Sequence, residues 1–227
     1  MSTKSMDSKA RRRFLSGVGV VATGATLAST ARAADNSETR FTPVRHAQDA
    51  WLDVPSEHRA FIDSSTTLGG ITALNYANNI LFAHAEDYAG NESDYGLVVC
   101  FRHQSTPFGY NDSIWAKYGN FFSTFLDFKD PRSDESFTSN PLNQARSDFF
   151  NKGNTIDSLI ARGVSFVICN KATRAMAGRL AGVSSNSVEE VYQDLRANNI
   201  TNSRYVAAGV IATTRSQEYG YSLLYAG

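Results

Sequence analysis

The chain has 227 residues and is electrically balanced, with 22 basic and 22 acidic residues. Its two cysteines are too few for a small fold stapled by disulfides, so the fold must rely on a hydrophobic core. The four histidines lack metal-ligand spacing, and no phosphate-binding glycine loop follows a predicted strand. We therefore expect neither a metal site nor a bound cofactor.

Residues 1–33 have the three parts of an export signal. A basic stretch ends in the pattern Arg-Arg-x-Phe-Leu, an uncharged run rich in Gly and Ala follows, and Ala-Arg-Ala supplies a small-x-small cleavage site. The run lacks the Leu and Ile density of a stable membrane span, which favours cleavage over an uncleaved anchor. The residues that carry this twin-arginine signal are Arg11, Arg12, Phe14, Leu15, Ala31 and Ala33. The prediction is export to the periplasm.

Removal of this signal changes the charge of the protein. The remaining residues include 16 basic and 21 acidic side chains, a net charge of −5. A mildly acidic domain lacks the positive charge that binding to nucleic acid requires. No later segment is apolar enough to span a membrane. The remaining length suffices for one well-filled core.

Short apolar runs alternate with helical patterns along the rest of the chain. Residues 34–57 form a polar lead-in with one short helix near 48–52. The predicted strands then lie at 58–63, 96–101, 164–169, 205–210 and 221–225. The predicted helices lie at 71–88, 107–118, 155–162, 172–180, 187–197 and 211–219.

This alternation predicts the fold class. Strands separated by helices pair in parallel through right-handed crossovers, which gives an α/β three-layer sandwich with a mostly parallel sheet. Residues 58–227 would form this single domain. Residues 119–151 read as an irregular insertion with four phenylalanines between 121 and 128, which is either a lid or an oligomer contact.

A candidate nucleophile, Cys169, lies at the end of the predicted strand 164–168. Asn170 can cap the helix that follows, and the helix N-terminus, Lys171 and Arg174 would all favour a thiolate. The alternative is a small core residue at a strand end, because free cysteine is commonly buried.

A second candidate group follows the strand at 96–101. Arg102 and His103 could bind an anion or move a proton, although a solvated loop with a capping histidine is the alternative. Cys100 lies within the strand and is predicted to be a core residue. The two cysteines should therefore lie at different depths and form no disulfide.

The surroundings of Cys169 resemble the DsrE/DsrF-like family of sulfur-relay proteins. The similarity rests on a helix ending in Arg162-Gly163, the strand 164–168 with the cysteine at its tip, and the helix behind it. The closing run 206–221 also looks like the family's last strand–helix–strand, in which the penultimate strand ends in Gly-Val and a glycine precedes the final strand. The resemblance spans roughly residues 58–227.

This resemblance implies a frequently oligomeric α/β protein of DsrE-like (flavodoxin-like) topology that holds a persulfide on Cys169. The chain would then be a persulfide carrier or sulfurtransferase, with Arg102 and His103 binding an anionic sulfur donor and a donor or acceptor protein as partner. It departs from the family in its longer insertion and in having no cysteine near its C-terminus. The alternative is a non-catalytic binding or assembly subunit that uses the aromatic segment 119–128 as its contact surface.

Overall fold

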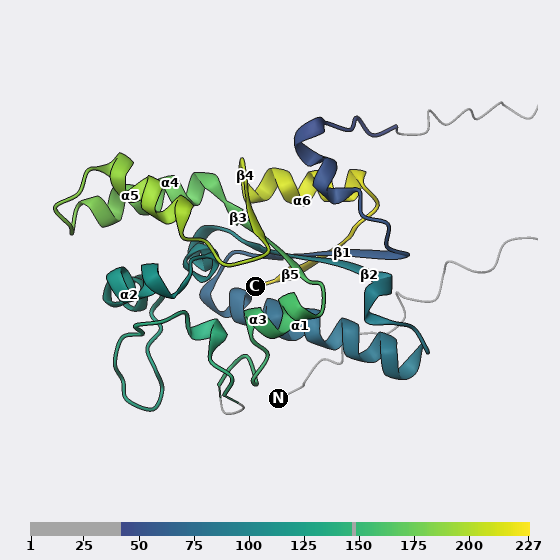
Figure 1. Cartoon of the computed structure of the whole chain (residues 1–227), viewed down its shortest axis with the longest axis horizontal. Helices are drawn as coiled ribbons and strands as arrows, with labels where there is room; N and C mark the ends of the chain where they lie inside the picture. The colour runs from purple at the N-terminus through teal and green to yellow at the C-terminus, as the bar shows by residue number, and fades with distance from the viewer. Residues whose placement is uncertain (1–41, 147–148) are drawn as a thin grey trace, which may run out of the picture. The chain divides into compact units, whose positions relative to one another are not determined.

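One parallel sheet of five strands, in the order β4-β3-β2-β1-β5, organises the described part of the chain (Figure 1). The computed structural model describes residues 42–146 and 149–227, so the predicted export signal lies outside the described residues. The strands are β1 His58–Ser64, β2 Tyr95–Phe101, β3 Ser165–Cys169, β4 Ser203–Val206 and β5 Ser222–Ala226.

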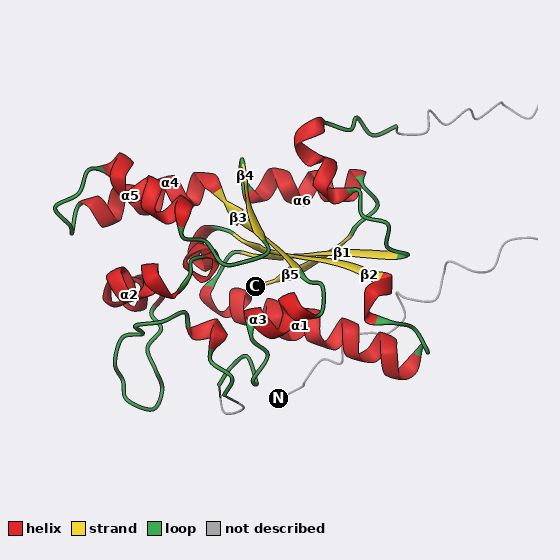
Figure 2. Ribbon diagram, viewed as in Figure 1, coloured by secondary structure: helices red, strands yellow, loops and turns green. Residues whose placement is uncertain are grey.

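Helices cover both faces of this sheet, which confirms the predicted α/β three-layer class (Figure 2). The α-helices are α1 Thr67–Asp87, α2 Asp112–Leu126, α3 Ile156–Ala161, α4 Asn170–Ala181, α5 Val188–Ala197 and α6 Gly209–Glu218. Short 3₁₀ helices are η1 Ala47–Leu52, η2 Glu92–Asp94, η3 His103–Gly109 and η4 Pro141–Asn143. The strand order differs from the flavodoxin order 2-1-3-4-5, so the flavodoxin-like topology was wrong in this detail.

The strand β1 lies between β2 and β5 and is buried over most of its length. Its side chains alternate between the two faces, so that Ile62 packs with α1 and Phe61 packs on the opposite side, with α6. Because both faces are covered, the centre of the strand, residues 60–62, is apolar, and the polar Asp63 follows it. That carboxylate is buried and must therefore have a partner.

The two faces carry cores of different size. The larger core lies between the sheet and α1, α2, α3 and η3, and it includes the fully buried Trp115, Phe101 and Phe166. The smaller core lies under α6 and η1, where Leu52 is completely buried. The short helix predicted near 48–52 is thus confirmed as η1, and it packs as part of the domain, not as a separate lead-in.

Three sequence predictions need correction. The segment predicted as irregular from 119 is helical as far as Leu126. Its phenylalanines pack against the larger core, because Phe122 and Phe128 are buried and Phe121 is half-buried. The strand β4 ends at Val206, and Gly209 and Val210 form the first turn of α6, not the end of a strand.

No helix among the described residues has the length and apolar character required to cross a bilayer.

Candidate functional site

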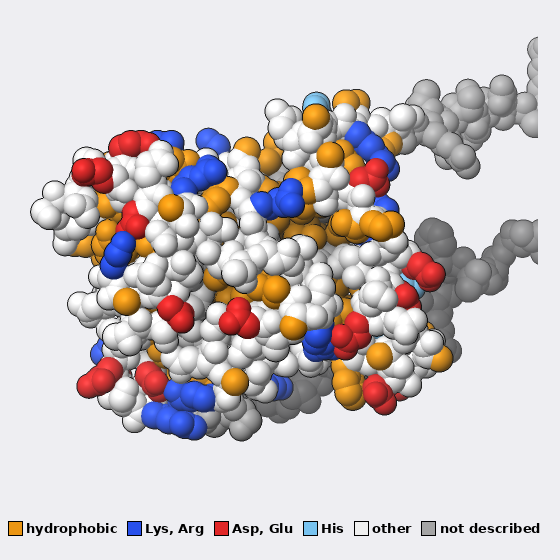
Figure 3. Space-filling model, in the orientation of Figure 1, with side chains coloured by type: hydrophobic (Ala, Val, Ile, Leu, Met, Phe, Trp, Pro, Cys, Tyr) orange, Lys and Arg blue, Asp and Glu red, His pale blue; other side chains and the backbone are white. Residues whose placement is uncertain are grey.

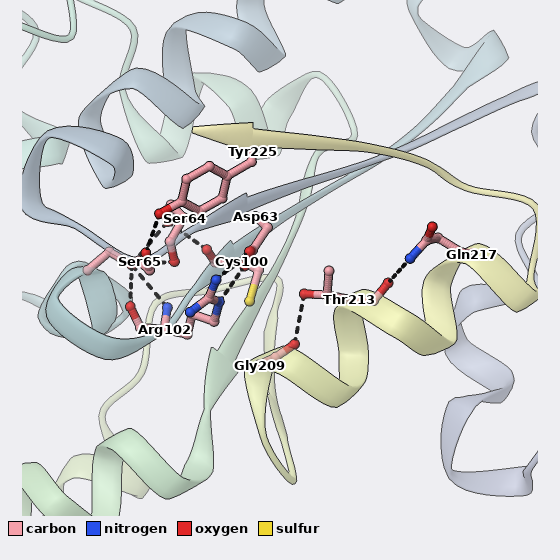
Figure 4. Close-up of polar contacts among 10 residues, drawn as sticks. Asp63, Ser64, Ser65, Cys100, Arg102, Gly209, Thr213, Gln217 and Tyr225 are labelled. Carbon is pink, nitrogen blue, oxygen red and sulfur yellow. Dashed lines mark hydrogen bonds and ion pairs between the residues drawn. The ribbon is translucent and has the colours of Figure 1, made fainter. Parts of the chain in front are cut away.

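The carboxyl ends of β1, β2 and β3 meet at one edge of the sheet, where the predicted reactive groups gather. Asp63 pairs in register with Cys100 on one side and Tyr225 on the other, so these three side chains share the face covered by α6. Cys169, the last residue of β3, lies on the same face two residues beyond the partner of Cys100. Figure 4 shows Cys100 and Arg102 beside the first turn of α6.

Asp63 and Arg102 form a bidentate ion pair at this edge. The Nε and Nη2 groups of Arg102 donate to the two carboxylate oxygens of Asp63, each at 2.7 Å. The hydrogen bonds that Arg102 donates to Asp63 raise the pKa of Arg102, so the guanidinium stays charged. The expected anion-binding role of Arg102 is therefore restricted, since two of its donor groups are engaged. Among the described residues Nη1 has no hydrogen-bond partner, and this group remains for a ligand.

Serine hydroxyls hold the backbone around this ion pair. The Ser64 hydroxyl donates to the Cys100 carbonyl at 2.6 Å, and Ser105 Oγ accepts from the Arg102 backbone N–H at 3.0 Å. The Ser65 hydroxyl lies 2.7 Å from the Tyr225 hydroxyl, which ties β5 to the loop after β1. These bonds position the strand ends without presenting a free reactive hydroxyl.

Cys169 is the N-cap of α4. Its Sγ accepts a hydrogen bond from the Ala172 backbone N–H at 3.4 Å, the role predicted for Asn170. Asn170 is instead the first helical residue, and its side chain accepts from the Tyr192 hydroxyl at 2.7 Å. Cys169 is a free thiol with 7% of its surface exposed. The sulfur therefore lies at the positive end of the α4 helix dipole, with one backbone N–H donating to it.

The two cations predicted beside Cys169 have different positions. Lys171 is exposed on the first turn of α4. The Arg174 guanidinium stacks on the Tyr192 ring at 4.0 Å and lies 3.6 Å from Glu189. Its charge is therefore directed to the α4–α5 hairpin, and the structure does not bring it to the thiol.

Cys100 is fully buried beneath the ion pair, as the sequence predicted. Burial, followed by the negative charge of Asp63, raises its pKa well above that of a free thiol. Strand spacing and rise place its Cα about 8 Å from that of Cys169, which exceeds the ~7 Å limit for a disulfide. Both thiols are free in the structure.

His103 lines a cavity beside α4. The residue has a left-handed backbone (φ 55°) and an exposed side chain. The cavity, of about 190 Å³, also contacts Gln104, Phe125 and Arg179. The Arg179 guanidinium stacks on Phe125 at 5.0 Å and supplies a cation to this cavity. Ala172, whose N–H contacts the Cys169 sulfur, forms part of its wall.

Sequence reasoning missed Arg179, although a signal for it existed. Residues 172, 175, 176 and 179 have the spacing of one helix face, and all four line the cavity. Within residues 42–146 and 149–227, no group of three or more His, Cys, Asp or Glu side chains is placed to hold a metal ion.

No protein-family model matches this chain, and no curated protein matches it closely enough to count as a relative. The DsrE-like resemblance therefore stays a prediction.

Proposed function

We propose that the protein is a sulfur carrier that holds a persulfide on Cys169. The observation that carries this proposal is a free thiol at the carboxyl edge of the sheet whose sulfur accepts an N–H at the start of α4. A helix start stabilises negative charge on a thiolate and on the terminal sulfur of a persulfide alike.

The proposed step is a displacement on a sulfane sulfur, with thiosulfate as the simplest donor. The Cys169 thiolate attacks the outer sulfur, a new S–S bond forms to that atom, and the S–S bond inside thiosulfate breaks. Sulfite leaves with the electron pair of that bond, and the negative charge of the thiolate is now on the terminal sulfur of the persulfide. Attack by an acceptor thiolate on that terminal sulfur would return Cys169 to its starting state.

Cationic groups at this end of the sheet suit an anionic donor. Arg102 directly follows β2, the strand that pairs with β3, and keeps its Nη1 free, while Arg179 and His103 line the cavity whose wall includes Ala172. Because Cys169 is only 7% exposed, the donor's outer sulfur must reach it through a narrow opening. This favours a small inorganic donor or an extended persulfide group over a bulky one.

The test is the intact mass of the full-length protein after incubation with thiosulfate or polysulfide. We expect a gain of one sulfur atom that dithiothreitol reverses and that Cys169→Ser abolishes. Cys100→Ser is the matched control and should keep the added sulfur. Arg179→Gln should slow sulfur loading without changing its site. An unchanged mass, or the same gain in Cys169→Ser, would overturn the proposal.

We also propose that the protein acts in the periplasm after twin-arginine export. The support is the Arg11-Arg12 pair and the cleavage pattern ending at Ala33. Replacing both arginines by lysine should leave uncleaved precursor in the cytoplasm. Normal periplasmic accumulation of that variant would show that this route is wrong.

A second candidate function is a non-catalytic subunit that assembles through the edge strand β5. The segment 119–128 does not suit this role, because most of its aromatic side chains pack in the core. Leu223, Leu224 and Tyr225 on β5 are exposed instead, and hydrophobic side chains also reach the surface over α6 (Figure 3). An uncharged edge strand is a template for pairing with a second copy. Leu224→Lys should convert an oligomer into a monomer in light scattering, and a wild-type monomer would remove this candidate.

A further inference from the structure

A second cavity lies at the opposite edge of the sheet from Cys169. It has a volume of about 290 Å³ and is bounded by η1 and by the amino-terminal parts of β2 and β3. Trp51 and Val54 form one wall, and Val98 and Val167 form the floor. None of these residues belongs to the site around Cys169, so ligand binding in this cavity does not depend on the proposed sulfur-carrier function.

Tyr221 places an unsatisfied polar group at this cavity. Gly220, with a positive φ of 81°, turns the chain so that Tyr221 enters the smaller core just before β5. The side chain is 4% exposed, and its buried hydroxyl has no hydrogen-bond partner among the described residues. Burial raises the pKa of Tyr221 to about 12, so the hydroxyl remains a neutral donor. A buried hydroxyl without a partner is costly, and a ligand acceptor would satisfy it.

The neighbouring cation does not supply a partner for this hydroxyl. Arg59, whose charge acts on Tyr221, donates its own N–H groups to the Val54 and Tyr219 carbonyls. The phenol therefore stays available although a guanidinium is close.

Arg204 gives the cavity a positive charge. Its guanidinium lies 5.1 Å from the centre of the Trp51 ring, and the described residues offer it no ion-pair partner. The other arginine of the lining, Arg162, is neutralised by Glu92 at 2.6 Å. An anion is thus favoured beside Arg204, and a flat apolar group is favoured against Trp51.

We propose that this cavity binds a small aromatic carboxylate with a second oxygen on its ring. The carboxylate would pair with Arg204, the ring would contact Trp51 and Val54, and the second oxygen would accept from the Tyr221 hydroxyl. The volume lies at the lower end of small-molecule sites, which suits one ring and excludes a dinucleotide.

The test compares two probes, 4-hydroxybenzoate and benzoate, by titration calorimetry on the full-length protein. We expect wild type to bind 4-hydroxybenzoate about five- to tenfold more tightly than benzoate, because only the former reaches Tyr221. Tyr221→Phe should remove this difference and leave benzoate affinity unchanged. Arg204→Gln should weaken both probes to a similar extent.

Two controls separate this site from a fold defect and from the sulfur site. Tyr221→Phe should keep or raise the thermal midpoint, because it removes an unpaired buried hydroxyl. Tyr225→Phe removes a hydroxyl on β5 that is bonded to Ser65 and lies outside the cavity lining. This variant and Cys169→Ser should leave the probe affinities unchanged. Equal affinities for the two probes in wild type, the same preference in Tyr221→Phe, or no binding of either probe would overturn the proposal.

Discussion

The carboxylate of Asp63 and the guanidinium of Arg102 join the ends of two adjacent central strands through two hydrogen bonds of 2.7 Å. Asp63 is 4% exposed, and the Arg102 side chain passes close to Gly209 at the start of α6. The pair therefore connects β1, β2 and α6 at the edge that holds both cysteines. It stabilises this edge only while both partners are present, because either charge alone would be buried without compensation.

Asp63→Asn should destabilise the fold strongly. The amide keeps the size of the side chain but leaves the half-buried Arg102 charge without its carboxylate partner, so we expect the free energy of unfolding to fall by about 1–3 kcal/mol. Urea denaturation measures this loss. Asp134→Asn, which removes the exposed pair with Lys129, is the matched control and should change stability by less than about 0.5 kcal/mol. Equal effects of the two variants would contradict the structural role of the Asp63–Arg102 pair.

Two glycine substitutions should have opposite effects on stability. A Cβ at Gly209 would lie 2.7 Å from Arg102 Cβ, so Gly209→Ala should push that side chain away and cost about 1–3 kcal/mol. A Cβ at Gly178 in α4 meets nothing within 4 Å, so Gly178→Ala should stabilise the protein by about 0.5–1 kcal/mol. Thermal midpoints of the two variants check the sign. A stabilising Gly209→Ala would mean that α6 does not pack on Arg102 as described.

The two thiols should react at different rates in the folded protein. Cys100 is completely buried with a raised pKa, whereas Cys169 is partly accessible. Iodoacetamide at pH 8 should therefore label Cys169 first, as peptide mapping will show, and Cys169→Ser should lose native labelling. Both thiols should be labelled after unfolding without reductant. Recovery of a cross-linked Cys100–Cys169 peptide, or faster labelling of Cys100, would contradict this geometry.

Stability should decline at alkaline pH because of Cys100. Its pKa is higher in the folded protein than in the unfolded chain, so its contribution is complete below about pH 8.5 and is lost as the pH rises towards the folded value. Between pH 8.5 and 9.5 the free energy of unfolding should fall by up to about 1.4 kcal/mol for this one group. Cys100→Ala should flatten the slope, even though it lowers stability overall. The same slope in both proteins would show that Cys100 does not titrate in this way.

Much of the fold could be predicted from local patterns. The apolar runs at 96–101 and 164–169 became β2 and β3, and the helix predicted at 187–197 became α5, which begins with a capping box between Ser187 and Glu190. These strands and this helix start depend on residues only a few positions apart, so a short stretch of sequence is enough to predict them. The apolar character of the sequence continues past the end of β4, so the predicted strand wrongly included Gly209 and Val210, which belong to α6.

The sequence by itself determined the α/β class, the strand that delivers Cys169 and the arginine that follows β2. Only the tertiary structure decided the strand order, the pairing of Arg102 with Asp63 and the grouping of Trp51, Arg204 and Tyr221 at one cavity. The physical reason is that side-chain partners across a sheet are set by strand order and register. These arise from contacts between residues far apart in the chain, which no local pattern records.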